Sequence, residues 1–263
     1  MKNKNGIIVL IIVLVIIIFA LISFLYNSLT GNFEFKNFGS VFQGEKINCI
    51  TEESYDIEEI ERLKIKAKLG DIKLKTSDDS AIKCEVYGKD SEDVKVKLNN
   101  KELNITYTQN GFNLFGNNSF KREIIVFIPE DYNGDINIES DCGDFEAANL
   151  KNVSLDIKQD CGDVEIGDIK NVSVDSSLGD VKIKSINNKC KIDVDCGDVK
   201  IDSVQIKENS SIKNDLGDVK IESINDIYID ADTDLGEVEI VSNNRKSEVT
   251  LKIECDCGDI KVD

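Results

Sequence analysis

The feature that most constrains this fold is a short motif, Cys/Leu-Gly-Asp/Glu before an apolar-polar-apolar triplet, which recurs seven times after residue 134. Successive motif glycines lie 17 to 22 residues apart. A period near 20 residues predicts a repeat architecture in which each unit buries its apolar face against its neighbours. The motif glycines, which we predict to form the turns, are Gly143, Gly162, Gly179, Gly197, Gly217, Gly236 and Gly258.

Each unit also shares an internal pattern of apolar positions. Ile192, Val194 and Cys196 alternate with polar residues, and the pattern then skips two residues and resumes at Val199 and Ile201. A straight strand would turn the later residues to the opposite face. We therefore expect a chain bend at each skip, where glycine can adopt a positive φ at little cost.

Two architectures fit this pattern. In a β-solenoid each unit is one coil of about 19 residues, and each strand pairs with its copy in the next coil. In a hairpin array Gly-Asp is a two-residue turn, and Cys161 faces Val164. The matching of successive units favours the solenoid, because every stacked coil must present the same cross-section. We predict an all-β fold with a right-handed parallel β-helix.

The domain plan follows from where the repeat begins. Residues 46–133 alternate with period two and predict an N-terminal β region, which contains an earlier copy of the motif, "KLGDIKL". Residues 134–263 form the predicted Gly-Asp solenoid. We expect it to end in an open strand edge at Asp263, through which a second copy could pair, although the sequence leaves the oligomeric state open.

The position before each glycine is filled by cysteine or leucine. A position that accepts leucine is expected to be apolar and inward, and a free cysteine packs as a small hydrophobic residue. Disulfides between neighbouring coils are an alternative, whereas "CDC" at 255–257 lacks the spacing of a zinc site. The predicted core column is Cys142, Cys161, Leu178, Cys196, Leu216, Leu235 and Cys257.

The acid after each glycine should form a second column. Stacked carboxylates about 4.8 Å apart repel one another by about 1 kcal/mol per pair in water. Backbone N–H groups at the bend could hold them, or Ca²⁺ could bridge neighbouring coils. The sequence requires no cofactor beyond this candidate calcium ladder of Asp144, Asp163, Asp180, Asp198, Asp218, Glu237 and Asp259.

The N-terminal segment predicts a membrane anchor. Residues 7–26 are twenty uncharged residues, long enough to span the hydrocarbon core as a helix. Lys2 and Lys4 place residues 1–6 in the cytoplasm and the remainder outside, with residues 27–45 as a tether. A cleaved signal peptide is the alternative, but the run is longer than usual and no A-x-A-like site follows it.

Composition argues against several function classes. The chain has no histidine and a net charge of −18, so imidazole catalysis and nucleic-acid binding are not expected. From Gly134 onward the only aromatic residues are Phe145 and Tyr228, and Arg245 is the only arginine. We therefore expect that the protein is not an enzyme. A polysaccharide-acting β-helix enzyme is a remote alternative, because such enzymes usually display aromatic and basic residues in a cleft.

The layout of an anchor, an early "LGDIKL", then "IPEDYNGDINIESDCGDF" and serial Gly-Asp units resembles the DUF4097 family of bacterial proteins. The resemblance covers residues 45–263. It implies a cell-envelope protein, described as an adhesin with β-strand repeats, and carries over no catalytic residues. Relatives more often have Ser or Thr before the repeated Gly-Asp, so the Cys/Leu column is a departure.

Together these features predict a single-pass protein of the bacterial cell membrane with an extracellular, non-catalytic ectodomain that binds or scaffolds. Its partner could be an envelope protein, a cationic peptide or a wall polymer. The alternative is an envelope-stress sensor that engages cationic peptides or a membrane signalling partner.

Overall fold

The computed structural model describes residues 48–88, 93–108 and 122–263. One compact unit spans Gly44–Asp263. The predicted membrane helix at 7–26 and the whole predicted tether at 27–45 lie outside the described residues. Within the described ranges, no helix is long and apolar enough to cross a bilayer. The one helix there is a single 3-10 turn, η2 (Ile57–Glu59).

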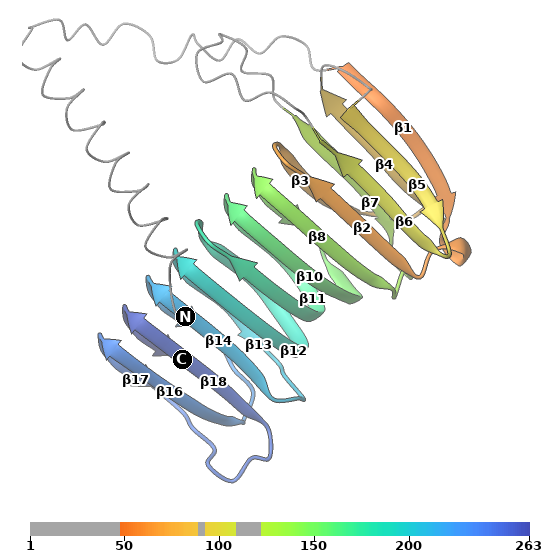
Figure 1. Cartoon of the computed structure of the whole chain (residues 1–263). Coiled ribbons are helices and arrows are strands. Elements are labelled where there is room, and N and C mark those ends of the chain that lie inside the picture. Colours follow the sequence, from red (N-terminus) through yellow and green to blue (C-terminus); the bar gives the residue numbers. More distant parts are fainter. Residues whose placement is uncertain (1–47, 89–92, 109–121) are drawn as a thin grey trace, which may run out of the picture. The chain divides into compact units, whose positions relative to one another are not determined.

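The described part of the chain is a β-solenoid, built from coils that stack through strand pairing (Figure 1). One side of the stack, which we call the long ladder, is parallel from β6 onward and antiparallel only at the β5–β6 hairpin. In stacking order it contains β5 (Val94–Asn99), β6 (Glu102–Tyr107), β2 (Arg62–Ala67), β8 (Asp135–Cys142), β10 (Leu150–Cys161), the second parts of β11 (Val164–Ser176) and β12 (Val181–Cys196), β14 (Ser210–Leu216), β18 (Thr250–Cys257) and β16 (Tyr228–Leu235).

A second side, the short ladder, follows a turn glycine in every coil from that of β3 onward. Its first two pairings are antiparallel and the others are parallel. In stacking order it contains β1 (Asn48–Asp56), β4 (Ala81–Gly88), β7 (Glu123–Pro129), β3 (Asp71–Ser77), β9 (Phe145–Ala147), the first parts of β11 and β12, β13 (Val199–Val204), β15 (Val219–Ile221), β19 (Ile260–Val262) and β17 (Val238–Ile240).

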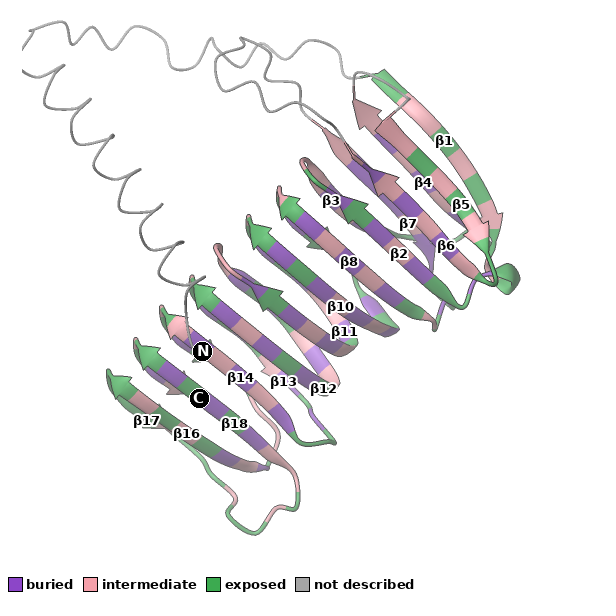
Figure 2. Ribbon diagram, in the orientation of Figure 1, coloured by how far each residue is buried: buried purple, intermediate pink, exposed green. Residues whose placement is uncertain are grey.

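The parallel pairing confirms the predicted solenoid over the hairpin array. Val181 and Ile183 stand beside Val199 and Ile201 of the next coil, so each inward residue packs on its own copy. The buried and exposed positions alternate along the strands in Figure 2. After the second skip the chain turns inward again at Ile186, and this position is buried as the pattern predicted. The hand of the solenoid stays a prediction.

The coils do not stack in chain order at either end. The coil of β2 and β3 lies between the coils of β6–β7 and β8–β9. At the other end, β18 and β19 lie between β14–β15 and β16–β17. The expected open edge at Asp263 is therefore wrong, and the end coil is β16–β17. Asn243 covers part of that edge, because its side-chain amide bonds both the N–H and the C=O of Ile229, at 3.0 and 2.8 Å.

Candidate functional site

The Gly-Asp turns occupy one corner of the solenoid, between the long and short ladders. Six of the seven motif glycines, together with Gly70, have φ between +130° and +154°. A Cβ on Gly197 would lie 2.1 Å from the carbonyl oxygen of Gly179 in the next coil. Glycine is thus needed both for the backbone conformation and for the close approach of the coils.

The aspartates of the predicted calcium ladder form a chain of hydrogen bonds along this corner. The Oδ1 atom of each carboxylate accepts a bond from the backbone N–H of the corresponding acid in the next coil. For example, Asp198 accepts from the N–H of Asp218 at 2.9 Å. The other donor-to-acceptor pairs are Asp144 to Asp71, Asp163 to Asp144, Asp180 to Asp163, Asp198 to Asp180, Asp259 to Asp218 and Glu237 to Asp259, at 2.8 to 3.2 Å.

This geometry explains how so many acids can be stacked. Each carboxylate is stabilised by a charge-assisted bond to the backbone, and the exposed face of the column is solvated. Calcium prefers six to eight oxygen ligands around one ion. Among the residues that the structure describes, no group of three or more Cys, Asp or Glu side chains converges as a metal site. The backbone bonds supply the stabilisation for which calcium was the alternative explanation.

The Cys/Leu column exists, but its predicted inward position is wrong. Strand register aligns Cys161 with Cys142, Cys196 with Leu216, and Cys257 with both Leu216 and Leu235. Cys161, Cys196 and Cys257 are exposed, and Cys142 and Leu178 are half-buried. Leu216 is 47% exposed and Leu235 70%. The period-two pattern fails here because the chain already bends at the residue before glycine, so the side chain points off the corner. We call this outward column the corner ridge.

A different column, which sequence reasoning missed, points inward two residues earlier. It includes polar side chains that are almost fully buried: Ser140, Gln159, Ser176 and Asn214. Asn214 donates from Nδ2 to the carbonyl oxygen of Gly197 at 3.0 Å, and Thr233 donates from Oγ1 to that of Gly258 at 3.0 Å. Asn214 and Thr233 thus bond carbonyls of the tight turns. The available signal was a polar residue at an apolar phase, two positions before the Cys/Leu.

A groove runs across the outer face of the long ladder, over β8, β10, β11 and β12. Its volume is about 420 Å³. Strand register places Arg62, Asp135, Ser154, Asn171 and Lys189 in one row across five coils. A parallel row contains Asn137, Asp156, Ser173 and Lys191. The centre of both rows is small and polar, and cationic side chains lie toward the ends.

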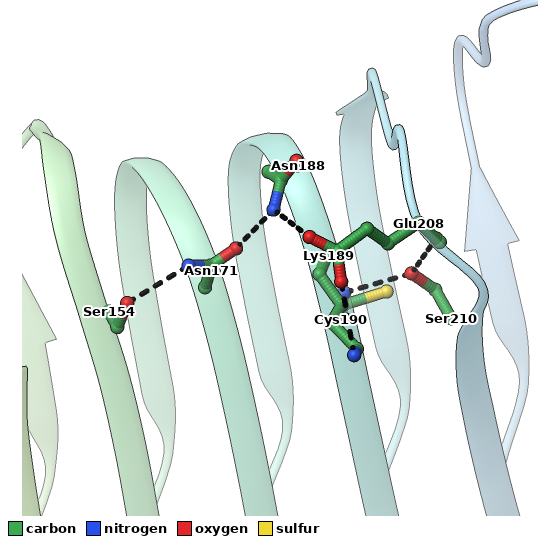
Figure 3. Close-up of polar contacts among 7 residues, drawn as sticks. All are labelled: Ser154, Asn171, Asn188, Lys189, Cys190, Glu208 and Ser210. Atoms are coloured by element: carbon green, nitrogen blue, oxygen red, sulfur yellow. Dashed lines mark hydrogen bonds and ion pairs between the residues drawn. The ribbon is translucent and has the colours of Figure 1, made fainter.

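Part of this groove is held by a side-chain network that crosses the coils (Figure 3). Asn171 donates from Nδ2 to Ser154 at 2.9 Å, and Asn188 donates to Oδ1 of Asn171 at 2.8 Å. Asn188 also donates to Glu208 at 3.0 Å, and Glu208 pairs with Lys189 at 3.2 Å. The network holds Ser154, Asn171 and Asn188 against one another across the coils. The result is a preformed row of hydrogen-bond donors and acceptors with charge of both signs.

The two serines of the groove lie among polar and charged neighbours. Ser154 accepts from an amide, and Ser173 is flanked in register by Asp156 and Lys191 on the open face of a sheet. Such a surface suits reversible binding of a polar ligand by several weak hydrogen bonds.

A family model and one solved structure support the fold. Residues 60–263 match the family model described as Toastrack DUF4097. A "putative adhesin" from Bacteroides fragilis has 17% identity and a TM-score of 0.55, with 84% of this chain and 98% of that chain covered. A "putative cell adhesion protein" from Clostridium sporogenes has 17% identity and a TM-score of 0.43, with 82% and 99% covered. No curated protein matches the chain.

Proposed function

Because the chain belongs to the Toastrack DUF4097 family, we propose that it is a non-catalytic binding protein of the bacterial envelope. Its ligand is a polar polymer or a polar protein surface, and the groove over β8, β10, β11 and β12 is the binding site. The observation that carries the proposal is the pair of polar rows that continues across adjacent coils, half-buried at its centre and exposed at its charged ends. A regular repeat of this kind matches a ligand that is itself extended.

The relatives favour the same class of function. The solved structure from Bacteroides fragilis is described as an adhesin, and at 17% identity it supports a common fold rather than a common ligand.

In the proposal, the apolar run at residues 7–26 is a membrane helix that holds the solenoid outside the cell. Protease added to intact cells should then degrade residues 48–263, and alkaline carbonate should leave the chain in the membrane fraction. Release by carbonate would contradict the anchor.

The groove is tested by photo-crosslinking the full chain in its own cells. A photoreactive amino acid replaces Ser173 at the centre of the groove. The matched control places it at Ser203, which is equally half-buried but lies on the short ladder. We expect an adduct from position 173 that is absent from 203. Adducts of equal yield at both positions would contradict a specific groove.

The identity of the adduct separates the two functional classes. Recovery of wall polymer or of proteins from neighbouring cells supports adhesion or scaffolding. Recovery of one membrane signalling protein supports the envelope-sensor alternative. In a second experiment the photoreactive amino acid replaces Asn137 instead of Ser173. Adding the substitution Ser173→Trp should then abolish the adduct, because the indole fills the groove.

A further inference from the structure

Two cysteines of the corner ridge are direct neighbours in adjacent coils. Cys142 ends β8 and Cys161 ends β10, and the two residues are partners in the parallel register. The N–H of Gly143 donates to the carbonyl oxygen of Cys161 at 3.0 Å, which fixes one coil against the other at this point. Cys161 is exposed and Cys142 half-buried, so reagents can reach the pair.

The spacing of the pair suits a covalent bond. Disulfides join residues whose Cα atoms are about 4.4 to 6.8 Å apart. Neighbouring strands lie about 4.8 Å apart, which is within this range.

We propose that Cys142 and Cys161 form a reversible disulfide that bridges the coils of β8 and β10. The oxidant is a low-molecular-weight disulfide. The thiolate of one cysteine attacks this disulfide, forms a mixed disulfide and releases one thiolate. The second cysteine, as its thiolate, then attacks the protein sulfur of the mixed disulfide and releases the other thiolate. Two protein thiols are oxidised, one external disulfide is reduced to two thiols, and the protons pass to the leaving thiolates.

The other six cysteines serve as built-in controls. On the ridge, Cys196 pairs in register with Leu216, and Cys257 lies between Leu216 and Leu235, so neither has a cysteine at the adjacent position there. Burial raises the pKa of Cys84 and of Cys190 to about 12, which suppresses their thiolates. Cys255 is buried as well, and Cys49 is exposed in β1, where it pairs with Tyr87. The bridge is therefore specific to one pair among eight thiols.

The test uses the full chain in detergent at pH 8 with a series of reduced and oxidised glutathione mixtures. Remaining thiols are alkylated, and the protein is digested with trypsin without reduction. We expect peptide 123–151 linked to peptide 159–170, in at least about tenfold excess over any other cysteine pair, and reversal in excess reduced glutathione. Cys196 and Cys257 should be recovered alkylated or as glutathione adducts.

Variants separate the bridge from general thiol chemistry. The double variant Cys196→Ser, Cys257→Ser should give the same linked peptide with the same glutathione dependence. Cys142→Ser should leave a stable glutathione adduct on Cys161, because the resolving thiol is gone. A stable adduct on Cys161 in the unsubstituted chain, full alkylation of both thiols at every ratio, or linkage mainly through Cys196 or Cys257 would each overturn the proposal.

Discussion

At the scale of single residues, the turn glycines carry the tightest constraint in the molecule. Gly197 has φ +147°, and any Cβ would collide with the Gly179 carbonyl at 2.1 Å. We expect Gly197→Ala to lower the free energy of unfolding by about 2 to 4 kcal/mol, because backbone strain and overpacking add. Urea unfolding measures the loss, with exposed Lys207→Ala as control. A loss below about 1 kcal/mol would contradict the tight stacking.

Two substitutions in the aspartate ladder separate the contribution of hydrogen bonding to stability from that of charge. Asp198→Asn keeps an oxygen acceptor for the N–H of Asp218 and removes one of the stacked negative charges. Asp198→Ala removes the acceptor. We expect a loss of about 1 kcal/mol for alanine and little or no loss for asparagine, in urea unfolding at low salt. Equal losses for both variants would mean that the charge itself is required.

The ionisation of Asp195, which lies near Asp193 and Asp215, lowers the stability of the fold in a pH-dependent way. Burial raises the pKa of Asp195, and the negative charges of Asp215 and Asp193 raise it further. Its folded pKa therefore lies above the unfolded value of about 3.9. Its contribution to stability is complete below that value and is lost as pH rises through the folded pKa.

The replacement Asp195→Asn should remove this cost. We expect a higher melting temperature than the unsubstituted chain at pH 7, and a difference that shrinks as the pH approaches 4. Exposed Asp202→Asn on β13 controls for the loss of one negative charge. A gain that persists unchanged at pH 4 would contradict the assignment to Asp195 ionisation.

At the scale of the element, each coil follows from its sequence pattern except at the corner. The alternation correctly predicted the inward apolar rows, such as Val199 and Ile201, because those strands are straight and their side chains alternate. The same alternation predicted wrongly that Cys196 is buried, because it assumes that the strand continues straight through a residue at which the chain bends. The inward Asn214 could not be predicted by hydropathy, since its role depends on the Gly197 carbonyl of another coil. The groove depends on the register between coils, so the sequence pattern could not predict it either.

The buried amide gives a test at this scale. Asn214 is fully buried and donates to the Gly197 carbonyl at 3.0 Å. Asn214→Asp is nearly isosteric but places a carboxylate against that carbonyl oxygen. We expect a loss of about 3 kcal/mol or more at pH 7, and a smaller loss at low pH, where the protonated acid can donate. Asn171→Asp, on the outer face, should cost far less, and equal costs would contradict the role of the inward column.

At the scale of the whole unit, the interleaved coils make chain position a poor guide to structural position. Truncation after Val249 removes an inner layer, so β14–β15 lose their partners on one side and β16–β17 lose their only partners. Deletion of residues 228–249 removes only the end coil. It joins Ile227 to Thr250, which is the register partner of Tyr228.

We expect the 22-residue internal deletion to be better tolerated than the shorter truncation. Amide hydrogen exchange over β14 and β15 measures the difference, because their second parallel partners, β18 and β19, survive only in the internal deletion. Protection should persist there and fall by at least about tenfold after truncation. The reverse order would mean that the β16–β17 coil, rather than the β18–β19 coil, stabilises the stack.

The interleaving also has a consequence for how the chain is made. A ribosome delivers β16 and β17 before β18 and β19, so the end coil emerges while its final neighbour does not yet exist. Until residues 250–262 are synthesised, the bare edges of β14 and β16 can join only each other or another chain. The later coil must then insert between them. Completion of this stack thus waits for residues 250–262, and crowding by a second nascent chain during that interval favours exchange of coils between molecules.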